Sequence, residues 1–144
     1  MSTYTRLTIY TDGASRGNPG PAAVGVHIVD DTTKQTVEDL ECVLGVATNN
    51  VAEYRAVLYA VEWLLAQKEL LADALHITFR LDSQVVALQL SGQYQIHDLK
   101  LRPLAEDIQE RLSQLPGTHA FEQIPREENT PADRLANHAL DTHA

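Results

Sequence analysis

The stretch from Tyr10 to Pro21 constrains the fold of this chain more than any other part of it. It continues an alternating run of β-branched and aromatic residues, Leu7–Thr11, which predicts a buried strand with Asp12 at its carboxyl end. Glycines then allow backbone conformations or close approaches that a Cβ would block, at Gly13, Gly17 and Gly20. A carboxylate at the end of a strand and before a glycine-rich turn is a candidate functional group, although a lone Asp-Gly pair is as often part of an ordinary turn.

Length and charge limit what the chain can be. Its 144 residues, 44% of them hydrophobic, predict one domain over residues 1–144 with a single core. There is no apolar run of membrane-spanning length and no amino-terminal export signal, so we expect a cytoplasmic protein with no membrane partner. The net charge of −9 argues against a broad basic face, so any binding to nucleic acid should be weak, local or assisted.

Hydrophobic periodicity and turn residues divide the rest of the chain into strands and helices. Further strands are predicted over residues 22–30, 35–46, 75–81 and 118–124. Helices are predicted over residues 51–70, 84–90, 103–115 and 132–143. This order predicts an α/β fold: a mixed five-stranded sheet, three antiparallel strands and then parallel strands, with helices on both faces.

Four acidic residues fall where such a sheet would bring them together. Asp12 and Asp82 each follow a strand, and the carboxyl ends of parallel strands form the edge where open α/β sheets bind ligands. Glu53 and Asp133 lie in the first turns of two predicted helices and can reach that edge. Taken singly, each has an ordinary explanation as a turn residue, a cap or a favourable charge at a helix amino-terminus.

Together, the four carboxylates indicate a metal site. Converging carboxylates repel one another unless they are protonated or bound to cations. Oxygen ligands suit Mg²⁺ or Mn²⁺, and several carboxylates can hold two such ions for phosphoryl transfer. The histidines lack zinc-like spacing, and the glycines lack the G-x-G-x-x-G spacing of a dinucleotide loop, which disfavours a small-molecule α/β enzyme.

Four motifs resemble the type 1 ribonuclease H family. They are T-D-G-A-S-R-G-N-P-G at residues 11–20, T-N-N-V-A-E at 48–53, L-D-S-Q at 81–84 and E-N-T-P-A-D-R-L-A-N at 128–137. The resemblance runs nearly end to end and includes the order of the elements. Because the D-G-x-x-x-x-N-P-G block followed by T-N-N-x-x-E is highly specific, chance explains it poorly.

The resemblance implies a single ribonuclease H-like catalytic domain. Members of the family are metal-dependent endonucleases that cut the RNA strand of RNA/DNA hybrids by a two-metal-ion mechanism, leaving a 5′-phosphate and a 3′-hydroxyl. Carried onto this chain, the catalytic and metal-binding residues are Asp12, Glu53, Asp82 and Asp133, with two ions per site, Mg²⁺ or alternatively Mn²⁺. Asp12 would bridge both ions, Asp133 would help to hold one, and Glu53 and Asp82 would hold the other.

The resemblance also implies contacts with the substrate. Positions near the RNA 2′-hydroxyls, the groups that distinguish RNA from DNA, fall on Gly13, Ser15, Gly17 and Gln84. Contacts in the minor groove fall on Asn18, Asn49 and Asn50, and Thr48 matches part of a pocket for a DNA phosphate.

Three departures from the family pattern suggest a sub-branch. The short and mildly basic segment Gln93–Arg102 stands where many relatives have a basic, Trp-containing protrusion, so affinity for hybrid should be lower. Val46 stands where the phosphate pocket has an arginine. Pro125–Glu128 replaces the loop that carries a histidine in most relatives, which makes Arg126 the candidate substitute. Because the P-R-E-E-N pattern occurs in a sub-branch of the family, we interpret it as variation rather than loss of activity.

Two alternative functions stay open at this point. The first is the same chemistry with broader specificity, including double-stranded RNA, because weaker contacts with the DNA strand would lessen the penalty for a second RNA strand. The second is a catalytically silent nucleic-acid-binding module, against which the four carboxylates and the acidic net charge both count. Hydrolysis of double-stranded RNA tests the first, and binding without turnover tests the second.

Overall fold

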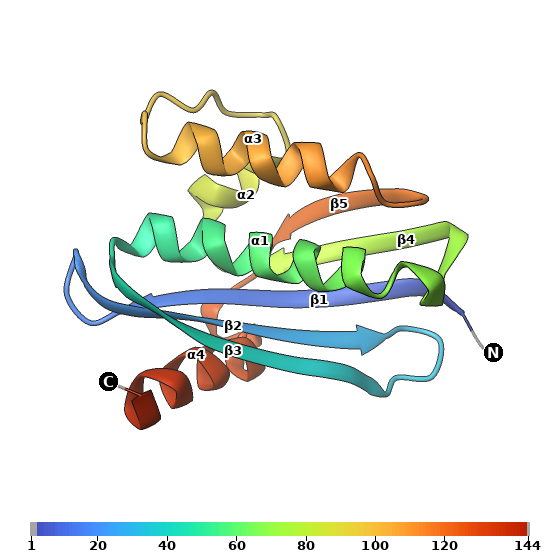
Figure 1. The fold of residues 1–144 in the computed structure, drawn as a ribbon, viewed down its shortest axis with the longest axis horizontal. Helices are drawn as coiled ribbons and strands as arrows, with labels where there is room; N and C mark the ends of the chain where they lie inside the picture. Colours follow the sequence, from blue (N-terminus) through green and yellow to red (C-terminus); the bar gives the residue numbers. More distant parts are fainter. Residues whose placement is uncertain (1–2, 144) are drawn as a thin grey trace.

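The computed structural model describes residues 3–143 and contains one five-stranded sheet (Figure 1). The strands are β1 (Tyr4–Ser15), β2 (Gly20–Asp30), β3 (Thr36–Ala47), β4 (Leu71–Leu81) and β5 (Thr118–Gln123). Their order in the sheet is β3-β2-β1-β4-β5. The first three strands pair antiparallel, whereas β4 pairs parallel with both β1 and β5. The predicted mixed sheet is therefore confirmed.

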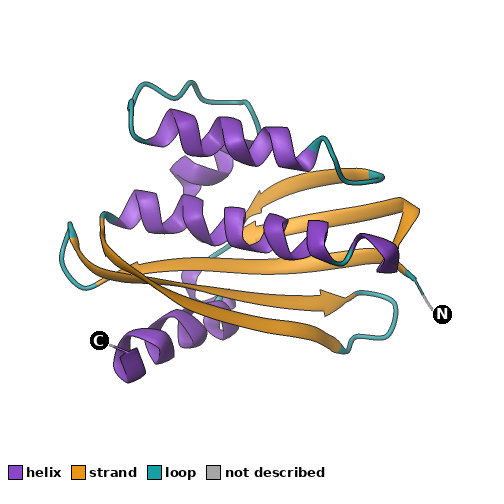
Figure 2. Cartoon of the chain, viewed as in Figure 1, coloured by secondary structure: helices purple, strands orange, loops and turns teal. Residues whose placement is uncertain are grey.

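Helices cover both faces of the sheet. They are α1 (Asn49–Ala66), α2 (Gln84–Leu90), α3 (Leu101–Leu112) and α4 (Thr130–His143), and 3₁₀ turns occur at η1 (Lys68–Leu70) and η2 (Arg126–Glu128). Figure 2 shows α1, α2 and α3 on one side of the strands and α4 on the other. The helix α1 packs on β1 and β2, α3 packs on α1, and α4 packs mainly on β2. No helix within residues 3–143 is long and apolar enough to cross a membrane.

The main core lies between α1 and the sheet. Side chains alternate between the two faces of a strand, so Leu7 and Ile9 of β1 both point to the α1 side and are fully buried. Tyr54, Val57 and Val61 meet them from α1 at helical spacing. Burial of these side chains fixes α1 against β1, and Asp12 is the last buried residue of that strand.

The first strand does not end at Asp12, as the sequence suggested. Its hairpin with β2 continues, pairing Asp12 with Gly25 and Ser15 with Ala22. The last pair in its parallel ladder with β4 is Tyr10 with Arg80. Asp12 therefore lies beyond the end of the parallel ladder while its backbone is still held by the antiparallel one.

Two glycines let helices approach the sheet closely beside Asp12. A Cβ on Gly13 would lie 2.2 Å from the backbone carbon of Ala52 in α1. A Cβ on Gly25 would lie 2.1 Å from the backbone oxygen of Ala132 in α4. Separations below 3.0 Å do not occur for real Cβ atoms, so glycine is required at both positions. The helices that carry Glu53 and Asp133 are thereby brought close to β1 and β2.

Candidate active site

The structure brings the four predicted carboxylates to one cavity of about 330 Å³. Asp12 comes from β1, Asp82 follows β4, and Asp133 lies in the first turn of α4. Glu53 lies two residues deeper in its helix than predicted, and so beyond the first turn, because α1 begins at Asn49 and not at Val51. That earlier start follows from Thr48, whose Oγ1 accepts a hydrogen bond from the Val51 amide at 3.2 Å and caps the helix.

The carboxylates are close enough to share a cation. One oxygen from each of Asp12, Glu53 and Asp82 lies within 4.8 Å of the others. Asp133 lines the same cavity and lies close enough to Asp12 to help raise its pKa. Asp12 and Glu53 are only 6% and 7% exposed, whereas Asp82 and Asp133 are half-buried. The cluster thus opens to solvent on the Asp82 and Asp133 side.

Burial and mutual repulsion change the ionisation of the cluster. Burial, followed by the charge of Asp82, raises the pKa of Asp12 to about 7. Burial, followed by the charge of Asp12, raises the pKa of Glu53 well above its ordinary value, and a backbone hydrogen bond from Gly13 acts in the opposite direction. In the absence of cations, the folded protein therefore retains protons here near neutral pH.

The donor set fits a hard divalent cation. Oε2 of Glu53 is buried and has no hydrogen-bond partner within the described part of the chain, although a buried acceptor of this kind normally has one. Its neighbours in the cluster, Asp12 and Asp82, also offer only carboxylate oxygens. Oxygen donors of this kind suit Mg²⁺ or Mn²⁺, which would also offset the repulsion among the carboxylates.

Some of the predicted substrate-binding residues line the same cavity. These are Gly13, Ser15 and Asn49. The others do not line it: Gly17, Asn18, Thr48, Asn50 and Gln84. Several of them instead shape the backbone nearby. Gly17 has φ +112°, and Oδ1 of Asn18 accepts a hydrogen bond from the Asn49 amide at 3.0 Å, which joins the turn after β1 to the start of α1.

Arg126 lines the carboxylate cavity. It belongs to the loop in which most members of the family carry a histidine that this chain lacks. Its backbone forms part of η2, immediately before α4. The side chain is exposed and lines the cavity that holds the four carboxylates. Val46, at the position of the missing phosphate-pocket arginine, is 73% exposed on β3.

Asn129 is a site residue that was not predicted from the sequence. It is fully buried, and its Nδ2 donates to the backbone oxygen of Thr11 at 2.9 Å and to Oδ2 of Asp82 at 3.0 Å. The available signal was its place in the E-N-T-P-A-D motif, where an asparagine before a helix is readily taken for a helix cap. Its partners are 118 and 47 residues away in sequence, which local patterns cannot reveal.

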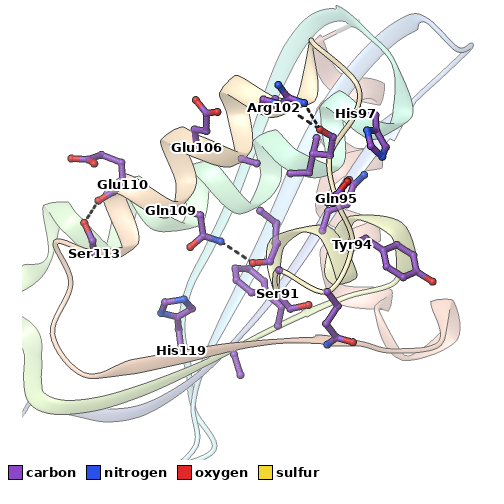
Figure 3. Close-up of a pocket in the computed structure, with 18 residues that line it drawn as sticks. Ser91, Tyr94, Gln95, His97, Arg102, Glu106, Gln109, Glu110, Ser113 and His119 are labelled. Atoms are coloured by element: carbon purple, nitrogen blue, oxygen red, sulfur yellow. Dashed lines mark hydrogen bonds between the residues drawn. The ribbon is translucent and has the colours of Figure 1, made fainter.

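A wider hollow, of about 1260 Å³, lies between α3 and β5 (Figure 3). It is walled by the end of α2, by residues 91–97 and by one face of α3. His119 points into it from β5, and Nε2 of Gln109 donates to the backbone oxygen of Leu90 at 2.8 Å. None of its lining residues lines the carboxylate cavity, so the larger hollow is separate from the acidic cluster.

Comparison with known protein families and sequences identifies relatives along almost the whole chain. The model of the Reverse transcriptase-like family matches residues 10–139. Ribonuclease HI of Halobacterium salinarum is 41% identical over 136 residues, which is 94% of this chain and 65% of that protein. A bifunctional protein of Mycobacterium tuberculosis is 34% identical over 139 residues, 96% of this chain but only 36% of that protein. The chain thus spans between about a third and two thirds of these curated relatives.

Two solved structures of ribonucleases H1 match over nearly their full length. The crystal structure of RNase H1 from Halobacterium salinarum has a TM-score of 0.86 and 39% identity, covering 95% of this chain and 98% of that one. LC11-RNase H1, solved in complex with an RNA/DNA hybrid, has a TM-score of 0.87 and 35% identity, covering 94% and 97%. Because the family model matches residues 10–139 and the likeness in backbone covers about 95% of the chain, this chain belongs to the type 1 ribonuclease H family.

Proposed function

We propose that this chain is a metal-dependent endoribonuclease that hydrolyses the RNA strand of RNA/DNA hybrids, leaving 5′-phosphate and 3′-hydroxyl ends. The observation that carries the proposal is the cluster of Asp12, Glu53 and Asp82 within 4.8 Å, with Asp133 beside Asp12 in the same cavity. The complex of LC11-RNase H1 with an RNA/DNA hybrid supports this class of substrate.

The proposed roles of the carboxylates follow from their positions. Two divalent cations, Mg²⁺ or Mn²⁺, would activate the attacking water and stabilise the leaving 3′-oxygen. Asp12 is the proposed shared ligand, because it lies within reach of the other three carboxylates. Glu53 and Asp82 have ligand oxygens within 4.8 Å of one of Asp12, and Asp133 is a further neighbour of Asp12, which supports a divided ligand set.

The proposed substrate contacts surround this cluster. We assign the RNA strand to the cavity wall formed by Gly13 and Ser15, and the minor groove to the turn joined to α1 by the hydrogen bond between Asn18 and Asn49. The remaining proposed contacts are Gly17, Thr48, Asn50 and Gln84. Arg126 is proposed to act on the scissile region from its position on the cavity wall. A cytoplasmic location and a single-domain organisation stay predictions.

The decisive experiment compares cleavage of RNA/DNA, RNA/RNA and DNA/DNA duplexes of one sequence, with Mg²⁺, with Mn²⁺ and with a chelator. We expect metal-dependent cutting of the RNA strand of the hybrid, and its loss in the Asp12→Asn variant. The variant removes a ligand charge with little change in volume, so it separates chemistry from folding.

The other outcomes each point to a different function. Cutting of RNA/RNA as well would establish the broader specificity, for which these relatives offer no support. Binding of hybrid without cutting under any metal condition would contradict the proposed activity and favour the silent binding module.

A further inference from the structure

We propose that Asn129 is a positioning residue that aims the Asp82 carboxylate at the bound cations. The inference rests on the proposed metal-dependent function and adds a residue to it. Its basis is that one buried side chain joins the loop before α4 to the carboxylate after β4 and to the backbone next to Asp12.

The orientation of the Asn129 amide follows from its neighbours. Nδ2 carries two hydrogens, and both groups that face it are acceptors: the Thr11 carbonyl at 2.9 Å and Oδ2 of Asp82 at 3.0 Å. The amide nitrogen, rather than the oxygen, must therefore point at them. One oxygen of Asp82 is thereby engaged, and the other stays free to act as a ligand.

The backbone of Asn129 fixes this amide in place. Its N–H donates to the Arg126 carbonyl at 3.0 Å, and its carbonyl accepts from the Asp133 amide at 3.1 Å. The residue thus contacts Asp82 directly, the backbone immediately before Asp12, and the backbone of Asp133. Asn129 therefore links the positions of three of the four carboxylate residues, Asp12, Asp82 and Asp133.

A purely structural role explains this residue less well. Oδ1 of Asn129 is buried and has no hydrogen-bond partner among the described residues, which is unfavourable for folding. Asp82 also lies among like charges and would turn away from Asp12 and Glu53 if nothing held it. The hydrogen bond from Asn129 opposes that rotation, so its loss should weaken cation binding more than substrate binding.

The test measures Mn²⁺ affinity by calorimetry without substrate, and kcat and KM on the hybrid, for Asn129→Ala and wild type. We expect Mn²⁺ affinity to fall about tenfold or more, as for other residues that orient a metal ligand, and kcat to fall while KM changes little. Thr130→Ala is the matched control, because it removes the hydrogen bond from Thr130 Oγ1 to the Glu127 carbonyl in the same loop without touching a carboxylate. Its Mn²⁺ affinity should stay at the wild-type value.

A double-mutant cycle shows whether Asn129 acts through Asp82. In an Asp82→Asn background, adding Asn129→Ala should change Mn²⁺ affinity far less than it does in the wild type. An equal loss in both backgrounds, or wild-type affinity in Asn129→Ala, would overturn the inference. If Asn129→Ala does not fold in urea titrations, Asn129→Ser takes its place, with the same expected loss and the same overturning result.

Failure of the proposed function looks different from failure of this inference. A wild-type protein that neither binds Mn²⁺ nor cuts hybrid would contradict the function itself. A wild type that does both, beside an Asn129→Ala variant with the same Mn²⁺ affinity, would contradict only the role of Asn129.

Discussion

Asp12 illustrates how a single buried residue can make a folded protein depend on cations. The side chain is 6% exposed and lies beside Glu53, Asp82 and Asp133, so its ionised form is disfavoured by burial and by like charges. Folding therefore brings together groups that oppose one another until cations bind. Residues of this kind are retained for what they bind rather than for stability.

The stability of the metal-free protein should fall as pH rises. The pKa of Asp12 is about 7 in the folded protein against an ordinary value of 3.8, so between these values the folded state binds more protons than the unfolded state. The free energy of unfolding then decreases with pH across that window, and the raised pKa of Glu53 acts in the same direction. Thermal unfolding in chelator at pH 5 and pH 8 measures this decrease.

Two comparisons test whether Asp12 causes this pH dependence of stability. Asp12→Asn should flatten the pH dependence, and Mg²⁺ or Mn²⁺ should raise the melting temperature of the wild type at pH 8 but much less that of the variant. Equal slopes in the wild type and the variant would show that the pH dependence arises elsewhere.

Arg126→Ala should lower kcat about tenfold, the loss expected for one hydrogen bond to a charged group. The guanidinium lies on the wall of the carboxylate cavity, where it can meet a phosphate oxygen. Arg126→Lys should restore part of the loss because it keeps the charge. Arg134→Ala, an exposed arginine of α4 that does not line the cavity, is the control, and an equal effect of the two alanine variants would argue for general electrostatics.

At the scale of elements, the sequence predicted the strands, the helices and the edge where the carboxylates meet, because periodicity and chain order determine them. The predicted end of β1 at Asp12 was wrong, because Gly13 was interpreted as part of a turn. Gly13 is instead paired with Val24 within β1, and it is required there by the approach of α1. Gly25 was not singled out, because the helix that touches it lies more than 100 residues further along the chain.

Gly25→Ala should displace α4 and with it Asp133. The added Cβ would lie 2.1 Å from the Ala132 oxygen, and such overpacking costs about 1–3 kcal/mol. We expect a lower urea midpoint together with a reduced kcat. Gly92→Ala is a control in which the Cβ meets no described atom within 4 Å, although φ is +82°. Gly92→Ala should lower the free energy of unfolding by about 1 kcal/mol and leave kcat unchanged. An unchanged kcat in Gly25→Ala would instead show that catalysis does not depend on the position of α4.

At the scale of the whole molecule, charge distinguishes this chain from a protein that grips nucleic acid along a broad basic face. The net charge is −9. The segment Gln93–Arg102, which stands where many relatives have a basic protrusion, has no regular structure before α3 begins at Leu101, and its residues 93–97 line the hollow next to α3. Binding of substrate should then rely on a small number of contacts with phosphates and on the cations themselves.

The salt dependence of cleavage measures the number of those contacts. A plot of log(kcat/KM) against log[KCl] at fixed Mg²⁺ should have a shallow slope, of about −1 to −3, since each contact with a phosphate contributes about −0.9. A slope of about −6 or steeper would require an extensive basic surface and would contradict this view of the interface.

The separation between the carboxylate cavity and the hollow beside α3 has a consequence for protein engineering. No residue of the segment 93–100 lines the carboxylate cavity, so a lysine-rich insertion grafted there would leave every residue of that cavity unchanged. We therefore expect such a graft to raise affinity for a nucleic-acid duplex while the residues of the carboxylate cavity stay the same.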